Sequence, residues 1–400
     1  MKRLLNKGGW SALTAALLMG SVPQDASAQW LTGEASMETR MFSSAPLQAV
    51  QDRHDASLVL APEFYVRVAG GGIVFAPYAR IDAADEERSH VDLRVLAWEG
   101  AFGDWEIAAG VSRVFWGVTE SQHLVDILNQ TDLVENLDGE DKLGQPMVKV
   151  GRVTDLGVFE AYALPGFRER TFPGREGRLR AGLPLDADRA QYTAEADARS
   201  VDFAARWSHF IGALDVGVSW FRGINREPGF LPLEGDAGGF APIYDVANQV
   251  GLDAQWTRDA WLWKFEGITR DAGQQGRYWA MTAGVEYSLY QIMGSDADLG
   301  LITEVLLDDR GDMATTPFED DIFVGGRLAM NDVAGSELLF GGIVDRSSGS
   351  TFLNLEGSRR LSNNWTIDLQ MRAFLGVDPG ERFHDLRNDD HLMVAFRRFF

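Results

Sequence analysis

The chain has 400 residues, and its 59 acidic residues outnumber its 37 lysines and arginines, which gives a formal net charge of −22. Such a charge repels phosphate groups, so we exclude nucleic acid as a partner. The chain holds no cysteine, which rules out a disulfide framework and a thiolate metal site.

The N-terminal residues 1–28 have the pattern of a secretory signal peptide. Cations lie ahead of an apolar run over residues 10–22, and a small-residue A-x-A cleavage site ends at Ala28. The run is too short to cross a bilayer as a helix. We therefore expect residues 1–28 to be a cleaved signal and residues 29–400 to form one unit. A buried N-terminal helix is the alternative.

After residue 28, apolar and polar side chains alternate with a period of two. The segment 365–375 (WTIDLQMRAFL) shows this best, with Asp368, Gln370 and Arg372 on the polar face. Alternating runs of about 9–11 residues cross a membrane as tilted strands. No second apolar run long enough for an inner-membrane helix follows the signal. The pattern predicts an all-β fold, a transmembrane antiparallel up-and-down β-barrel of about 18 strands.

The connections between the expected strands alternate in length. The strands are expected at 29–41, 56–68, 71–82, 89–100, 103–116, 146–154, 157–164, 199–208, 211–222, 247–258, 261–270, 277–290, 298–307, 320–330, 336–346, 350–360, 364–376 and 390–400. Short connections such as Ala69–Gly70 and Asp259–Ala260 alternate with longer ones, among them 117–145 and 165–198. Short periplasmic turns and long extracellular loops are typical of bacterial barrels, so we expect the protein in the cell outer membrane, in contact with its lipid and lipopolysaccharide.

The chain ends in a strand pattern, HLMVAFRRFF, with Phe396 and Phe400 on the face that we assign to lipid. This ending resembles the C-terminal signal that the barrel-assembly machinery recognises in outer-membrane proteins. Arg398 departs from the apolar residue usual at its position, although its long side chain can reach the membrane interface.

Two further stretches carry a family resemblance. Residues 113–148 contain VFWGVTESQHLVDILNQTD and GEDKLGQPMV, and residues 163–180 (ALPGFRERTFPGREGRLR) are followed by DFAARWSHF. These resemble an uncharacterised proteobacterial family of porin-like outer-membrane β-barrel proteins. The resemblance implies a barrel in the outer membrane and brings no established substrate.

The long connection 117–145 is the first candidate site. Its apolar residues recur at helical intervals, and between them lie charged and titratable residues that we take as constriction-loop candidates: Glu120, His123, Asp126, Asp132 and Glu135. We expect a short amphipathic helix that folds into the barrel and narrows it, where its carboxylates favour cations. A helix that lies outside on the barrel rim is the alternative.

The second candidate site is a group of arginines in the connection 165–198. These anion-binding candidates are Arg168, Arg170, Arg175, Arg178 and Arg180. Guanidinium groups suit carboxylates and phosphates, so an anionic substrate or lipopolysaccharide is one expected ligand. Local pairing with nearby acids such as Glu169 and Glu176 is the alternative.

The period-two pattern also predicts which charges face the lumen. The lumen-lining candidates are Glu286, Glu304, Arg327, Asp368 and Arg372. These charges either orient solutes in a transverse field or pair across strands. Acidic clusters at 138–141 and 308–312 lack the spacing of a calcium-binding loop, so we expect no metal and no cofactor.

These observations favour passive diffusion of small hydrophilic or charged solutes through the barrel. The alternatives are a substrate-specific barrel that exports or imports an anionic polymer or organic acid, and a non-conducting adhesion or assembly barrel. We do not expect an enzyme, because the six histidines are scattered and no G-x-S-x-G turn is present.

Overall fold

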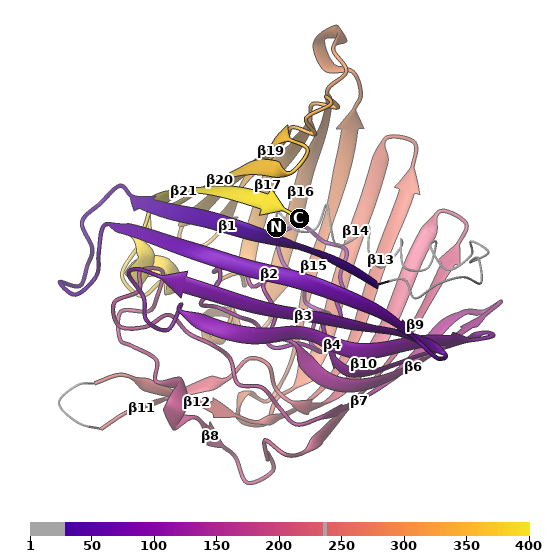
Figure 1. The fold of residues 1–400 in the computed structure, drawn as a ribbon. Coiled ribbons are helices and arrows are strands. Elements are labelled where there is room, and N and C mark those ends of the chain that lie inside the picture. Colours follow the sequence, from indigo (N-terminus) through magenta and orange to yellow (C-terminus); the bar gives the residue numbers. More distant parts are fainter. Residues whose placement is uncertain (1–28, 235–237) are drawn as a thin grey trace.

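The computed structural model describes residues 29–234 and 238–400, so the expected signal peptide at 1–28 lies outside the described residues. Eighteen strands form one antiparallel sheet that closes into a barrel (Figure 1). The first nine in chain order are β1 (Gln29–Phe42), β2 (His54–Val68), β3 (Gly71–Asp82), β4 (His90–Phe102), β5 (Trp105–Ser112), β6 (Gln145–Thr154), β7 (Gly157–Pro165), β9 (Val201–Ile211) and β10 (Leu214–Ile224).

The second nine are β13 (Val246–Arg258), β14 (Trp261–Asp271), β15 (Arg277–Leu289), β16 (Asp298–Asp308), β17 (Asp320–Ala329), β18 (Glu337–Asp345), β19 (Thr351–Ser362), β20 (Trp365–Leu375) and β21 (His391–Phe399). Each strand pairs with its neighbours in chain order. The fold predicted from the alternating pattern is therefore confirmed.

The barrel closes where the first strand meets the last. Met37 of β1 lies opposite Phe396 of β21. Beyond the end of β21, Phe400 exchanges two backbone hydrogen bonds with Gly33, at 3.0 and 3.1 Å. Closure leaves the sheet without free edges at this seam.

The barrel wall is inverted relative to a water-soluble β-sandwich. On β20 the polar residues Asp368, Gln370 and Arg372 are buried inside, whereas Leu369 and Met371 between them are exposed outside. Similar exposed apolar side chains occur all around the wall. A continuous apolar outer surface of this kind is stable only against lipid hydrocarbon.

Aromatic rings mark the periplasmic ends of the strands. Trp30 of β1 stacks on Tyr65 of β2 with 5.4 Å between ring centroids, and Trp261 lies 4.5 Å from Tyr287. Such girdles hold a barrel at the boundary between hydrocarbon and water. The turns at this end are short. One of them places Gly70 at φ 76°, which favours glycine.

The long loops gather at the opposite, extracellular end (Figure 1). They include a three-stranded sheet of β8 (Gln191–Tyr192), β11 (Gly229–Pro232) and β12 (Phe240–Tyr244). They also contain the 3-10 helices η1 (Ala187–Arg189), η2 (Gly273–Gln275), η4 (Gly311–Met313) and η5 (Arg382–Leu386), whereas η3 (Ile292–Gly294) lies in a periplasmic turn. None of the described helices is long and apolar enough to cross a membrane.

Candidate functional site in the barrel lumen

The chain between β5 and β6, residues 113–144, leaves the wall and lies inside the barrel; we call it the inserted segment. Its apolar residues Val125, Ile127 and Leu128 are almost fully buried. The turn inward uses Gly117 at φ 140°, where a Cβ atom would lie 2.9 Å from an oxygen of Glu266. A larger residue at Gly117 would therefore displace the segment from the wall.

Two carboxylates of the wall hold the backbone of the inserted segment. Glu266 on β14 accepts hydrogen bonds from the N–H groups of Val118 (2.7 Å), Thr119 (3.0 Å) and Val125 (3.2 Å). Glu304 on β16 accepts from the N–H groups of Glu120 and Ser121, both at 2.8 Å. Hydrogen bonds to an ionised acceptor are stronger than neutral ones, so these contacts fix the path of the segment.

The sequence predicts a helix within 117–145, and this prediction is wrong. Residues 113–144 contain turns and isolated bridges, such as Thr131↔Lys142, and no helix. In a helix the N–H groups would bond to carbonyl groups four residues earlier. Here Glu266 and Glu304 accept from several of them, so the helical spacing of apolar residues reflects packing against the wall.

The acidic side chains of the inserted segment pair with cations. Glu120 contacts Arg327 on β17 at 2.5 Å and Lys264 on β14 at 3.6 Å. Further along, Asp132 pairs with Arg94 on β4 at 2.6 Å, Glu135 with Arg80 on β3 at 2.7 Å, and Asp138 with Arg372 on β20 at 2.7 Å. The segment thus spans the lumen between strands on opposite sides of the barrel, and its acids are neutralised locally.

His123 and Asp126 have partners within the segment and on the wall. The imidazole of His123 lies 3.0 Å from Glu140 and 3.5 Å from Glu266. Burial alone would lower the pKa of His123, but these two carboxylates outweigh it and raise the pKa to about 10. Burial raises the pKa of Asp126, which lies 3.3 Å from Lys142.

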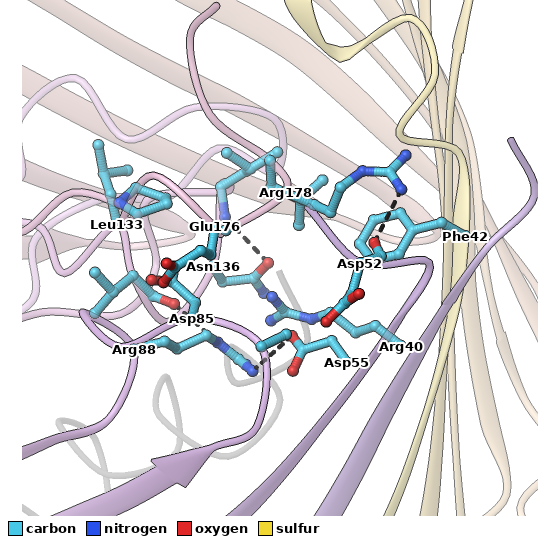
Figure 2. Close-up of a pocket in the computed structure, with 16 residues that line it drawn as sticks. Arg40, Phe42, Asp52, Asp55, Asp85, Arg88, Leu133, Asn136, Glu176 and Arg178 are labelled. Atoms are coloured by element: carbon cyan, nitrogen blue, oxygen red, sulfur yellow. Dashed lines mark hydrogen bonds and ion pairs between the residues drawn. The ribbon is translucent and has the colours of Figure 1, made fainter. Parts of the chain in front are cut away.

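A small cavity lies between the inserted segment, β1 and the extracellular loops (Figure 2). Arg88 points across it to Asp55 at 3.3 Å, and Arg178 donates to the carbonyl of Asp52 at 3.3 Å. The cavity volume is about 20 Å³, which is room for about one water molecule. The charges around it therefore join loops to wall and leave no space for a substrate.

The arginine group in 165–198 does not form one anion site. Arg168 pairs with Asp92 at 2.7 Å, and Arg178 pairs with Asp389 at 2.6 Å. Arg170 donates to carbonyl and amide oxygens, Arg180 donates to nearby backbone carbonyls, and Arg175 is exposed. These side chains are spread along the loop and are used mainly to fasten it.

The lumen-lining candidates all lie on the inner face. Glu304 and Arg327 contact the inserted segment, as does Arg372, while Glu286 lies 3.7 Å from Lys264. Asp368 pairs with Arg397 at 2.6 Å. Three of these five charges therefore hold the inserted segment, and the other two, Glu286 and Asp368, pair with cations on neighbouring strands.

Exposure of the inner face changes along the barrel. Towards the periplasm, Glu99 is exposed, and Glu106 and Glu160 are half-buried. Towards the extracellular end, Asp202 and Arg372 are buried among loops. The lumen therefore has a wet, charged periplasmic half and a densely packed extracellular half.

Sequence reasoning missed Arg80, which pairs with Glu135 of the inserted segment, and Arg88, which fastens the loop between β3 and β4 to the wall. Arg88 bonds Glu38 of β1 and Asp82 of β3, each at 2.6 Å. The available signal was the clustering of arginines between residues 80 and 94 in a strongly acidic chain. The sequence around these arginines does not identify their partners, because Glu135, the partner of Arg80, lies far along the chain.

One group of potential metal ligands occurs among the described residues, namely His90, Asp132 and Glu135, whose ligand atoms lie within 4.8 Å of one another. Arg94 and Arg80 already pair with the two carboxylates. Their positive charges oppose a bound cation, so the group is better described as part of the ion-pair network.

No protein-family model and no curated protein matches the chain. Among solved structures it is similar to Wzi of Escherichia coli, an outer-membrane protein involved in group 1 capsule assembly and described as a carbohydrate-binding β-barrel. The TM-score is 0.51 at 10% identity, over 91% of this chain and 83% of Wzi.

Porins give lower scores. One mutant of the Rh. blastica porin has a TM-score of 0.46 at 9% identity, over 93% of this chain and 100% of the porin. OmpT of Vibrio cholerae, an outer-membrane protein in a variant without loop L8, has a TM-score of 0.46 at 10% identity, over 94% and 100% of the two chains.

The fold therefore defines a closed β-barrel of the outer membrane. The apolar outer belt and the closed barrel place the protein in that membrane. At this level of identity the likeness concerns the fold alone. The resemblance to a proteobacterial family remains an expectation.

Proposed function

We propose that the protein is a passive, non-enzymatic channel for small hydrophilic or charged solutes, in which the inserted segment sets the width. The observation that carries this proposal is the placement of residues 113–144 across the lumen, bound to Glu266 and Glu304 on one side and to Arg372 on another. A loop folded inward and fastened by charges narrows a barrel without closing its periplasmic half.

The charged periplasmic half of the lumen also supports a channel. Exposed or half-buried acids there keep water in the barrel, which a solute needs in order to pass. The alternative, transport of an anionic polymer, requires a continuous cationic path. Arg168 and Arg178 are instead held by separate acids, so this alternative has less support.

We propose three kinds of partner for this channel. Small hydrophilic solutes pass through it, and outer-membrane lipid and lipopolysaccharide contact its outer belt. The barrel-assembly machinery recognises the last strand through Phe396 and Phe400, both of which are exposed on the outer face.

Solute flux into liposomes tests the proposal. Purified protein in liposomes is expected to admit small sugars and amino acids and to exclude larger oligosaccharides. A variant in which a short Gly-Ser linker replaces residues 118–142 should admit larger solutes and conduct more current in a planar bilayer. Asp215→Asn is a matched control, because Asp215 lies on β10, outside the residues that hold the segment.

The outcomes separate the three functions. Size-limited flux that widens in the linker variant supports a channel narrowed by the inserted segment. No flux in either protein, with folded barrels in both, would show a non-conducting barrel. Flux restricted to anionic oligomers would instead favour the polymer transporter.

A further inference from the structure

A second cavity, of about 690 Å³, lies in the barrel wall at β2, β3, β4 and β6. Val111, near the end of β5, also lines it, and the lining comes from both faces of the sheet. Leu60, Phe75 and Val91 face outward, whereas Asp92 and Arg168 lie on the lumen side. A cavity lined from both faces indicates that the strand pairing is interrupted there; we call it the lateral groove.

The backbone pairing explains the interruption. The ladder between β4 and β5 runs from Phe102↔Trp105 up to Leu96↔Val111 and stops there. Above that point β5 ends, because the chain turns into the lumen as the inserted segment. Residues 90–95, the extracellular part of β4, therefore have no pairing partner in β5. On that side they border the lateral groove.

The pairing on the other side of the groove is also irregular. The β2–β3 register runs from Ser57↔Asp82 to Leu60↔Ala79 and resumes only at Phe64↔Phe75, and Pro62 and Pro77 lie in the interval. Pairing of β3 with β4 shifts by one residue between Ala76 and Pro77. Proline has no N–H to donate to a ladder, and bulges concentrate next to functional sites.

Side chains close the gap on the lumen side. Arg168 spans it, pairing with Asp92 at 2.7 Å and donating to the carbonyl of Gly144 at 2.9 Å. The Arg168 side chain keeps 33% of its surface exposed, whereas Asp92 keeps 2%. A molecule that enters the groove therefore meets a guanidinium at its polar end and apolar side chains elsewhere. Val91, 82% exposed, stands at the outer margin.

We propose that the lateral groove binds a free single-chain amphiphile with an anionic head, such as a long-chain fatty acid carboxylate. The hydrocarbon chain lies against Leu60, Phe75 and Val91 at the height of the membrane, and the carboxylate meets Arg168. The volume of about 690 Å³ is in the range of ligand sites, about 300–1,000 Å³, and an apolar lining with a few polar groups, here the Asp92–Arg168 ion pair, matches their usual composition. A two-chain lipid fits less well, because the polar end lies inside the wall.

The test is equilibrium binding of radiolabelled palmitate to the purified full chain in non-ionic detergent. Saturable binding at one site is expected. Arg168→Gln should weaken it at least tenfold, and Arg168→Lys should restore most of the affinity because the charge returns. Val91→Trp should abolish binding by filling the groove. Val324→Trp is the matched control, since Val324 is an exposed outward residue on β17, away from the groove.

Several results would overturn the assignment. Non-saturable uptake that is equal in all variants would show simple partition into detergent. Equal affinity for hexadecanol, which has the same chain and no charge, would remove the role of Arg168. A two-chain phospholipid that co-purifies with the protein and that palmitate does not displace would assign the groove to membrane lipid. None of these results depends on channel conductance, so the test is independent of the proposed function.

Discussion

Replacing Glu266 by glutamine should release the inserted segment from the wall. The carboxylate accepts three backbone hydrogen bonds and one from the Thr119 hydroxyl, at 2.7 to 3.2 Å, and it lies 3.5 Å from the ring of His123. Each hydrogen bond to a charged group contributes about 1.5–3 kcal/mol. Glutamine keeps one accepting oxygen but turns an NH₂ group towards N–H donors.

Breaking a buried charge interaction by changing one partner costs about 3–5 kcal/mol. Since about 1.4 kcal/mol corresponds to a factor of ten, the undocked population of the segment should rise roughly a hundred-fold to a few thousand-fold in Glu266→Gln. The barrel itself should still form, because its strands pair through their backbones.

Hydrogen exchange followed by mass spectrometry measures this change directly. In peptides that contain Val118, Thr119 and Val125, protection against exchange should fall by the same factor as the undocked population rises. Peptides from the strands should keep their protection. Single-channel recordings should show more frequent openings to a larger conductance. Asp215→Asn serves as the control for a lost lumen carboxylate. Unchanged protection of these peptides in a correctly folded Glu266→Gln barrel would refute the argument that Glu266 fastens the segment.

Four other outcomes are expected. Glu120→Gln should shift the reversal potential towards anions at about 0.1 M salt, because Arg327 loses its acid partner and Lys264 loses one of two. The shift should shrink towards 1 M salt as the screening length shortens. An unchanged reversal potential would place the ion path elsewhere. The pKa of His123 in the folded protein is about 10, above its unfolded value. Protonated His123 therefore stabilises the docked segment fully below about pH 6.5, and this stabilisation is lost as pH rises through 10. The frequency of channel openings should rise between these pH values and should stay constant in His123→Gln. Deleting Phe400, which bonds β1, should lower the heat-modifiable folded fraction seen on gels. Trypsin applied to intact cells should cut at the exposed Arg175, whereas a cut beside the periplasmic turn at Asp259 would reverse the topology.

The strands could be predicted from sequence because each one carries its own signal. The alternation in 365–375 is local, and the membrane requires it of every strand, so the expected and observed bounds of β20 differ by one residue at each end. β3 and its short turn at Ala69–Gly70 agree with the expectation for the same reason. The small sheet of β8, β11 and β12 was not predicted, since strands of two to five residues show no periodicity.

The interior arrangement could not be predicted in the same way. The sequence shows which acids the inserted segment carries. Their partners lie on distant strands that come near the segment only in the closed barrel. The hydrogen bond from Glu120 to Glu304 joins residues 184 positions apart. Expecting those acids to select cations treated their charges as free, whereas Arg327, Arg94 and Arg372 neutralise three of them.

The contacts between the inserted segment and the wall also make docking of the segment depend on formation of the sheet. The segment precedes β14 and β16 in the chain, so it docks on Glu266 and Glu304 only after those later strands have joined the sheet. The seam between β1 and β21 is completed only with the last residue, Phe400. The partners of the segment come from strands as far apart in the chain as β4 and β20, so the full set is in place only when nearly the whole sheet has formed. A barrel in which residues 113–144 stayed outside would lose Glu135, Asp132 and Asp138 as partners of Arg80, Arg94 and Arg372, which would keep only their acid partners on the wall.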